Sequence, residues 1–340
     1  MTYFMRRLLG LVPTLLGISL LTFLMMHAGG GDPVAAMLGP EATEQDRIAL
    51  TRELGFDQPL PVQYLRWLGV LPRPVKVNAP GGGTEEVVRF SGVIQGDFGR
   101  SITTQRPVWE EIAQRLPATL ELGLAALFFA TITSLLVGIL SAVNPRGAID
   151  GISRFAVFVF LAMPSFWLGL ELIIIFSRWL QWFPPGGRGT PFTYAWLGHL
   201  VLPAITLGVG TGAFLCRILR SSMLEVLSAD YIRTGRAKGL SKWVIVMKHA
   251  LKNAMIPFIT VAGISAGSLL GGSIIVEAVF NWPGVGRLLV TSIFEYNFPV
   301  TIGCVFVLAT IFVLVNLLVD FSYSLLDPRI RVGAGGGEAR

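Results

Sequence analysis

Apolar runs of about 20 residues recur along this chain and limit its possible folds more than any other feature. A helix of that length spans the hydrocarbon core of a bilayer, which is about 30 Å thick. Only 14% of the 340 residues are charged, whereas soluble domains average about 25%. We therefore expect an all-α polytopic membrane protein with six transmembrane helices, at about residues 8–28, 117–143, 154–181, 199–220, 255–279 and 301–323.

Basic residues predict how these helices are oriented. Six helices place both ends of the chain on one side, and the segments expected on that side carry fifteen Lys and Arg, against three in the short loops on the other side. Because Lys and Arg are enriched in cytoplasmic loops, both ends are expected in the cytoplasm. The first run follows Arg6 and Arg7 and is too long for the core of a signal peptide, so we interpret it as a retained helix.

This arrangement divides the chain into four segments. They are a cytoplasmic N-terminus with the first helix at 1–28, a long external segment at 29–115, a five-helix core at 116–325 that includes a cytoplasmic loop at 222–254, and a cytoplasmic tail at 326–340.

The external segment contains two local signals. Thr43 and Gly55 bracket a short helix as an N-cap and a C-terminal stop. Residues 71–92 are rich in proline and glycine, which is typical of an irregular or hairpin insertion.

The cytoplasmic loop holds the most informative stretch, residues 230–257. Gly239 can adopt the left-handed conformation that ends a helix, and Ser241 can cap a second one. Two short helices, rich in Lys and Arg, are therefore expected to project from the membrane. Composition alone leaves open whether this is an ordinary basic loop or a functional surface.

Several strings in this chain resemble those of a known family. RTGRAKGL at 233–240 and HALKNAMIP at 249–257 are similar to the cytoplasmic coupling motif, the EAA loop, of ATP-binding-cassette importer permeases. More narrowly, the chain resembles the dipeptide/oligopeptide/nickel permease family, as its first-permease, B-type subunit. Further similar strings, in the family's order, are ELGFDQPLPVQYLRWL, GDFGRSI, RLPATLEL, AMPSFWLGL, VFNWPGVGRLL and LVDFSYSLLDPRIR. Gly235 departs from the alanine usual there, and residues 71–92 look like an insertion.

The resemblance implies a division of labour. The chain would be a permease subunit in a bacterial or archaeal inner membrane, forming half of a path for short peptides. Its partners would be a second permease subunit, two ATPase subunits and an external solute-binding protein. ATP and Mg would bind to the ATPases, and the chain itself has no phosphate-binding loop and no cofactor. Residues 230–252 would contact the ATPases, through Asp230, Arg233, Thr234, Gly235, Arg236, Ala237, Lys238, Gly239 and Leu240.

Three further groups are candidate sites. Gly263, Gly267 and Gly271 recur every four residues, which favours close helix packing, within the subunit or along the path. Glu171 is a carboxyl group deep in the third run and is either cavity-facing or structural. The external loop after the fifth run is either a docking and gating element or a structural cap; its candidate residues are Asn281, Trp282, Pro283, Gly284 and Gly286.

Other classes of protein fit less well. A self-contained ion-coupled secondary transporter is the main alternative, but the sequence has no obvious internal repeat and one deeply placed carboxyl group. No metal motif or Ser-His-Asp arrangement stands out, so we expect no catalytic residues and no metal site.

Overall fold

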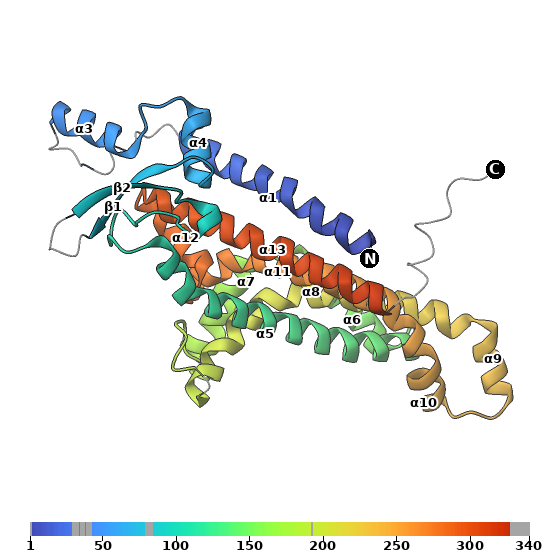
Figure 1. The fold of residues 1–340 in the computed structure, drawn as a ribbon. Coiled ribbons are helices and arrows are strands. Elements are labelled where there is room, and N and C mark those ends of the chain that lie inside the picture. The colour runs from blue at the N-terminus through green and yellow to red at the C-terminus, as the bar shows by residue number, and fades with distance from the viewer. Residues whose placement is uncertain are drawn as a thin grey trace, which may run out of the picture. The chain divides into compact units, whose positions relative to one another are not determined.

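The computed structural model describes residues 2–28, 34, 38, 43–78, 84–191 and 193–326. Helices form most of this part of the chain (Figure 1). The chain divides into two compact units, Met1–Pro117 with Val285–Thr310, and Ala118–Gly284 with Ile311–Arg340. The expected cytoplasmic tail at 326–340 lies outside the described residues after Leu326.

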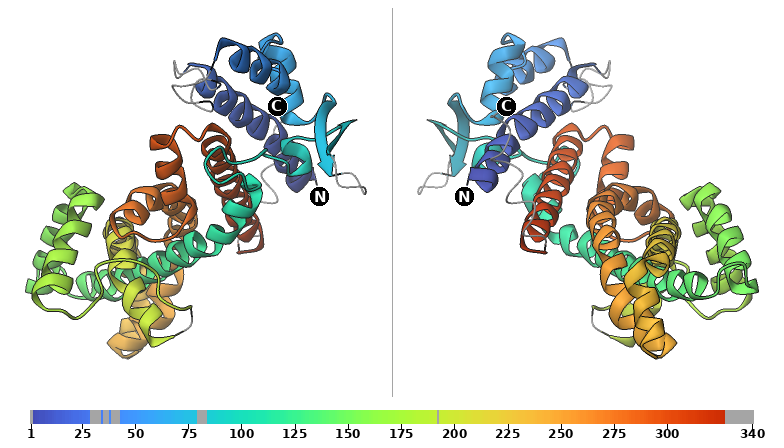
Figure 2. Two further views of the ribbon diagram at one scale, coloured as in Figure 1. Left: turned by 90° about the vertical axis from the view of Figure 1, so that its left-hand side faces the viewer. Right: turned by 90° about the vertical axis from the view of Figure 1, so that its right-hand side faces the viewer.

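The first unit combines short helices with a β-hairpin, which is visible in both views of Figure 2. Its elements are α1 (Thr2–Ala28), α3 (Glu44–Leu54), α4 (Leu60–Leu68), β1 (Arg73–Asn78), β2 (Thr84–Arg89), a 3-10 turn (Val93–Gln95) and α12 (Val285–Phe294). The strands pair antiparallel, with Arg73 opposite Arg89 and Asn78 opposite Thr84. The hairpin expected as one option for residues 71–92 is confirmed, so the fold is not entirely α-helical.

Helix α3 shows how local sequence sets its two ends. The Thr43 side chain accepts a hydrogen bond from the Asp46 backbone, and the Asp46 side chain accepts one from the Thr43 backbone. This reciprocal capping box satisfies amides that have no partner inside the helix. Gly55 closes the helix in the left-handed conformation, at φ 71°. The predicted helix between these two residues is confirmed.

Two polar residues hold the loops of the first unit together. The Asp97 carboxylate accepts hydrogen bonds from Ser91 Oγ, from Arg73 Nη2 at 2.7 Å and from Gly99 N at 2.9 Å. Asn297 Oδ1 accepts from Ile102 N at 3.1 Å. Asn297 thereby links the end of the GDFGRSI string to the turn between α12 and the last helix.

The second unit contains the long apolar helices. Its elements are α5 (Val108–Val143), α6 (Ala148–Ala162), α7 (Ser165–Leu172), a π-helical continuation (Ile173–Trp179), α8 (Tyr194–Ser228), α9 (Asp230–Ala237), α10 (Lys242–Val244), a second π-helical segment (Ile245–Ala250), α11 (Leu251–Val279) and α13 (Phe298–Leu326). Both α5 and α13 begin in the first unit and end in the second. Two buried clusters form its core. One includes Leu122, Leu202 and Trp282, and the other includes Leu219, Met223 and Phe258.

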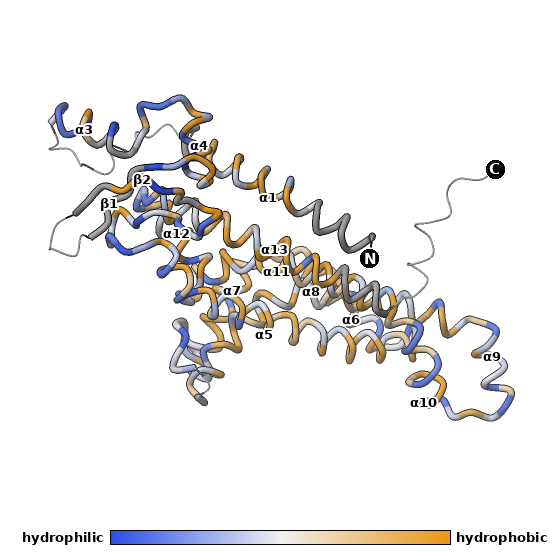
Figure 3. Tube along the Cα trace, in the orientation of Figure 1, coloured by the Kyte–Doolittle hydropathy of each residue, from blue (hydrophilic) through white to orange (hydrophobic). Residues whose placement is uncertain are grey.

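Four helices in the described residues are long and apolar enough to cross a membrane, or five if the bent pair α6–α7 counts as one span. In α1 the apolar stretch within the described residues is Val12–Leu24, which is shorter than a full span. Multiple membrane-spanning helices are therefore present, and the expected number of six remains a prediction. Figure 3 shows that hydropathy is high along α8, α11 and α13.

Two predicted spans differ from the structure. The third was expected to be continuous, but α6 and α7 meet at a bend of 108°. Pro164 lacks a backbone donor and disfavours a helical conformation at Met163, which is extended with ψ 128°. The second was expected to begin at Pro117, but α5 begins at Val108 and contains this proline.

Candidate functional site

The basic loop forms two short helices at one end of α8 and α11 (Figure 1). Helix α8 ends at Ser228. Ala229 is extended, with ψ 149°, and α9 begins at Asp230. The separation makes α9 a distinct element at the end of α8. Hydropathy falls in α9 relative to the long helices (Figure 3).

Helix α9 ends in a Schellman motif. Gly239 has φ +78°. Its N–H donates to Arg236 O at 3.0 Å, and the Leu240 N–H donates to Gly235 O at 3.2 Å. These are the two hydrogen bonds that define the motif. The predicted stop at Gly239 is confirmed.

The next helix starts at the predicted cap. Ser241 Oγ accepts a hydrogen bond from Val244 N at 3.5 Å. Helix α10 then passes through the π-helical segment into α11, so Lys242–Val279 forms one long helix. Any displacement of the turn at Gly239 therefore acts directly on a long apolar helix.

Two contacts fasten α9 to its neighbours. Ile232 is 1% exposed and packs in the same cluster as Met223 of α8 and Ala250 of the π-helical segment. The Asn253 side-chain amide donates to Tyr231 Oη at 2.7 Å, which joins α9 to α11. Sequence analysis missed both contacts, although an isolated isoleucine among polar residues is the signal that could have identified the first.

The remaining face of α9 is open. Asp230 and Arg233 form an exposed ion pair at 3.4 Å. Such pairs contribute little stability, so they do not explain why this face is charged. The residues of the predicted coupling set that are exposed are Asp230, Arg233, Thr234, Arg236, Ala237, Lys238, Gly239 and Leu240, and Gly235 is half-buried. The loop is thus rigidly held on one side and accessible on the other.

A buried ion pair lies at the same end of the helices. Asp150 Oδ1 lies 2.6 Å from Arg220 Nε, and Asp150 Oδ2 accepts from Arg220 Nη2 at 3.0 Å and from Arg146 N at 3.0 Å. Ser141 Oγ also donates to Asp150. The network ties α5, α6 and α8 together below α9.

The three glycines predicted from their spacing in α11 do not have the same surroundings. Gly267 is buried, and a Cβ there would lie 2.7 Å from Asn316 Oδ1 of α13. Gly271 is exposed, with nothing within 4 Å of such a Cβ. Gly263 is half-buried. Glu171 is half-buried in α7 and makes no hydrogen bond or ion pair within the described residues.

The predicted external loop is largely packed inward. Trp282 is fully buried and its Nε1 donates to Ala118 O at 2.8 Å. Gly284 is buried against the carboxyl group of Glu277. Gly286 is buried, Pro283 is half-buried and Asn281 is exposed, with φ 51°. This packing anchors the loop, whatever its exposed residues contact.

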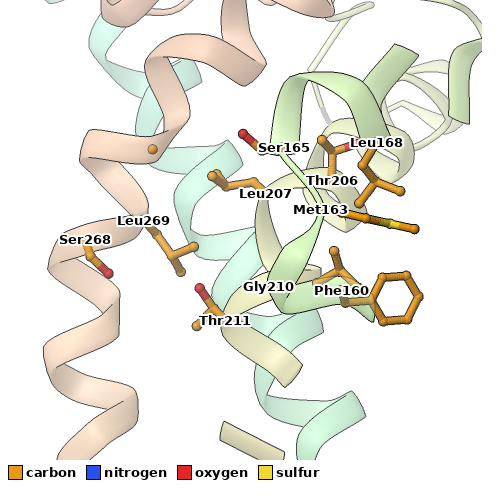
Figure 4. A pocket seen from close by; sticks show the side chains of 12 residues that line it. Phe160, Met163, Ser165, Leu168, Thr206, Leu207, Gly210, Thr211, Ser268 and Leu269 are labelled. Atoms are coloured by element: carbon orange, nitrogen blue, oxygen red, sulfur yellow. The ribbon is translucent and has the colours of Figure 1, made fainter. Parts of the chain in front are cut away.

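A cavity of about 200 Å³ opens among α6, α7, α8 and α11 of the second unit (Figure 4). Its lining includes Met163 and Ser165 at the bend between α6 and α7, Thr206, Gly210 and Thr211 of α8, and Ser268 of α11. Sequence analysis did not identify it, because its residues come from four separate helices. Within the described residues, no group of His, Cys, Asp and Glu side chains is arranged to hold a metal ion.

The chain combines long apolar helices with an exposed basic loop that packs against them on one side. This combination is typical of the membrane subunit of a transporter. Residues 134–332 match the family described as "Binding-protein-dependent transport system inner membrane component", and residues 1–123 match the N-terminal region of such components. The chain belongs to this family. It is therefore a permease subunit of an ATP-binding-cassette importer, a transport component and not an enzyme, and the alternative of a self-contained secondary transporter is not supported.

Curated relatives cover nearly the whole chain. The oligopeptide transport system permease protein AppB of Bacillus subtilis is 41% identical, covering 96% of this chain and 98% of its own length. The glutathione transport system permease protein GsiC of Salmonella paratyphi A is 41% identical, covering 97% and 99%. The dipeptide transport system permease protein DppB of Escherichia coli is 39% identical, also covering 97% and 99%.

A solved structure shares the fold. In the inward-facing MetNI methionine ABC transporter, one chain aligns with a TM-score of 0.50 and 21% identity, covering 64% of this chain and 94% of that chain. This similarity supports the permease fold assigned above.

Proposed function

We propose that this chain forms half of the translocation path of an importer for short peptides, in a bacterial or archaeal inner membrane. It crosses the membrane six times, with both termini in the cytoplasm. The peptide substrate is supported by the relatives, which are named for oligopeptides, glutathione and dipeptides at 39–41% identity. The particular peptides depend on an external solute-binding protein, which is a separate chain.

The loop at 230–252 couples the path to ATP hydrolysis. The observation that carries this proposal is the fastening of α9: Ile232 is buried, and the Schellman turn at Gly239 fixes the end of the helix, while its basic face stays open. A rigid element transmits a displacement to α8 and α11, whereas a loose loop would absorb it. The exposed Arg233, Arg236 and Lys238 suit a partner surface with acidic groups.

The proposed assembly contains four further chains. They are a second permease subunit, two ATPase subunits that bind ATP and Mg, and the external solute-binding protein. The exposed glycine Gly271 and the half-buried Glu171 are assigned to the side that faces the second permease or the path. The external loop around Asn281 is assigned to docking or gating.

The experiment substitutes Gly239 by aspartate in the complex purified with its ATPases. At φ +78° any side chain with a Cβ is strained, by about 1–2 kcal/mol. Gly96→Asp is the matched control, because Gly96 has φ +77° and equally open space in the first unit. We expect Gly239→Asp to lower peptide-stimulated ATP hydrolysis by about tenfold, or to prevent ATPase subunits from copurifying, and Gly96→Asp to do neither. Equal hydrolysis and copurification in both variants would contradict coupling through this loop.

A further inference from the structure

The cavity lies near the middle of each helix that forms it. Gly210 is close to the midpoint of α8, which runs from Tyr194 to Ser228. Ser268 is close to the midpoint of α11. The third wall is the bend itself, which falls midway along the pair Ala148–Ala162 and Ser165–Trp179. Helices that cross the bilayer therefore place this cavity near its central plane.

The lining is uncharged and combines apolar side chains, among them Phe160, Leu207 and Leu269, with four hydroxyl groups. Hydroxyl groups come from all three walls, at Ser165, Thr206, Thr211 and Ser268 (Figure 4). In the described part of the chain, the hydroxyls of Ser165 and Thr211 make no hydrogen bond. Thr206 donates to Leu202 O and Ser268 donates to Ser265 O, both at 2.8 Å, and the two hydroxyl oxygens can still accept. Because polar groups without partners are costly in a membrane interior, the two half-buried hydroxyls of Ser165 and Thr211 favour an occupant that offers hydrogen bonds.

Chemistry distinguishes the occupants that could fill this space. A lipid chain offers no hydrogen bonds, and the backbone groups of a neighbouring transmembrane helix are already satisfied within that helix. An extended peptide carries a free N–H and C=O at every residue except proline. The cavity has room for about seven waters at roughly 30 Å³ each. A cavity of this volume can hold one or two residues of a peptide together with some water.

We propose that the hydroxyl-lined cavity at Ser165, Thr206, Gly210, Thr211 and Ser268 is a subsite of the path that contacts the backbone of a passing peptide. This inference rests on the proposed function and assigns the part of the chain that touches the substrate. Hydroxyls donate and accept alike, and none of the lining residues is charged. The subsite therefore tolerates peptides of different sequence and net charge.

Gly210 provides a direct test, because a Cβ at this position would have nothing within 4 Å. A Cβ therefore fits without displacing packed atoms, and a larger side chain occupies space in the cavity. We expect Gly210→Leu to lower ATP-driven uptake of trialanine at least tenfold, in proteoliposomes that contain the full complex. Gly151→Leu is the matched control, since Gly151 lies in α6 with equally open space and outside the cavity. Its uptake is expected to match the wild type.

A charge placed in the cavity tests contact with the substrate independently of its size. Thr211→Asp is expected to shift the uptake ratio of Ala-Lys-Ala to Ala-Glu-Ala upward by about tenfold, because a carboxylate attracts the cation and repels the anion. Thr211→Asn is the uncharged control and should leave the ratio unchanged. A defect in folding alone lowers both rates and does not change the ratio.

The outcomes separate this inference from the proposed function. Absence of ATP-dependent trialanine uptake by the wild-type complex would contradict both. Wild-type uptake together with unimpaired Gly210→Leu and an unchanged ratio for Thr211→Asp would overturn the subsite alone, leaving the cavity to lipid or to the second permease. Loss of uptake in Gly210→Leu with failure of the permease pair to copurify would likewise overturn it, in favour of a helix-packing role.

Discussion

Gly235 lies two residues before the end of α9, and a Cβ added at this position would face Leu240. A methyl group there would lie 3.5 Å from Leu240 Cδ1, which is ordinary van der Waals contact. Alanine at this position therefore completes the apolar contact that accompanies a Schellman motif. It also removes the cost of about 1 kcal/mol that glycine imposes inside a helix.

We predict that Gly235→Ala slows amide hydrogen exchange in α9 by about fivefold, the equivalent of about 1 kcal/mol. The measurement is exchange mass spectrometry on peptides covering Asp230–Ala237. Gly239→Ala is the opposite control, since its φ of +78° disfavours a Cβ and should speed exchange. Slower exchange in both variants, or in neither, would contradict this account of the turn.

The carboxyl group of Asp97 makes the stability of the loops that it joins depend on pH. Burial of the carboxyl opposes ionisation, but hydrogen bonds from Ser91 and Gly99 and the Arg73 guanidinium outweigh it, so the pKa of Asp97 is lowered below its usual value. A folded-state pKa below the unfolded value, about 3.9, stabilises the fold at higher pH. That contribution is lost as pH falls through the folded value.

We predict that the wild-type segment around Asp97 loses its resistance to an acid-stable protease below about pH 4, and that Asp97→Asn is more readily cleaved at pH 7. The asparagine variant should show a weaker dependence on acid. Asp57→Asn is the control, because Asp57 is an exposed carboxyl group in the same segment. Equal cleavage of the wild type and Asp97→Asn across this pH range would show that the network contributes nothing.

Among the helices, the ion pair of Asp150 and Arg220, with Ser141, joins α5, α6 and α8 of the second unit. The Asp150 side chain is 1% exposed and that of Arg220 is 23% exposed. Removing one partner of a buried pair costs about 3–5 kcal/mol, because the other charge stays buried. Replacing both by apolar groups is often nearly neutral.

We predict that Arg220→Met lowers the melting temperature of the purified complex strongly, and that Arg220→Met with Asp150→Leu recovers most of the loss. Arg154→Met is the control, because Arg154 lies 3.5 Å from Asp150 but is 55% exposed. Its effect should stay below about 1 kcal/mol. A double variant that melts no higher than Arg220→Met would contradict this prediction. It would show that the ion pair makes a net contribution to stability that apolar side chains do not replace.

Some helix ends could be predicted from sequence because single residues determine them. Thr43, Gly55, Gly239 and Ser241 act within one turn of the chain, and each was located correctly. Prolines were harder to interpret. Pro117 fits a first turn and a helix interior alike, because neighbouring groups can satisfy the freed carbonyl in a membrane helix.

The local structure of the proposed coupling loop was predicted to a similar extent, and its contact with the ATPases stays a prediction. The position of the coupling loop follows from local residues, but its fastening by Ile232 and Tyr231 depends on helices that come together only in the fold. The cavity carries no local signal at all. A glycine such as Gly210 lines open space only because α6, α7 and α11 surround it.

Across the whole molecule, the distribution of basic residues bears on topology. Fifteen Lys and Arg fall in segments assigned to the cytoplasm, and three fall in the short external loops. The long external segment is exempt, because long loops cross the membrane largely regardless of charge. The six-span topology therefore depends on α1 crossing the membrane ahead of the helices of the core.

This topology predicts where introduced cysteines react in intact cells. A cysteine replacing Asp57 should react with a membrane-impermeant maleimide from outside, and one replacing Lys238 only after the cells are permeabilised. Both sites are exposed, while the native Cys216 and Cys304 are buried and can be replaced by alanine to remove background. A cysteine replacing Thr103 is a second external reporter, since Thr103 is exposed and follows the GDFGRSI string. Labelling of Lys238→Cys in intact cells would show that the helices of the core have the opposite orientation to the one predicted. If Asp57→Cys were protected while Thr103→Cys reacted, the segment between them would have to cross the membrane once more.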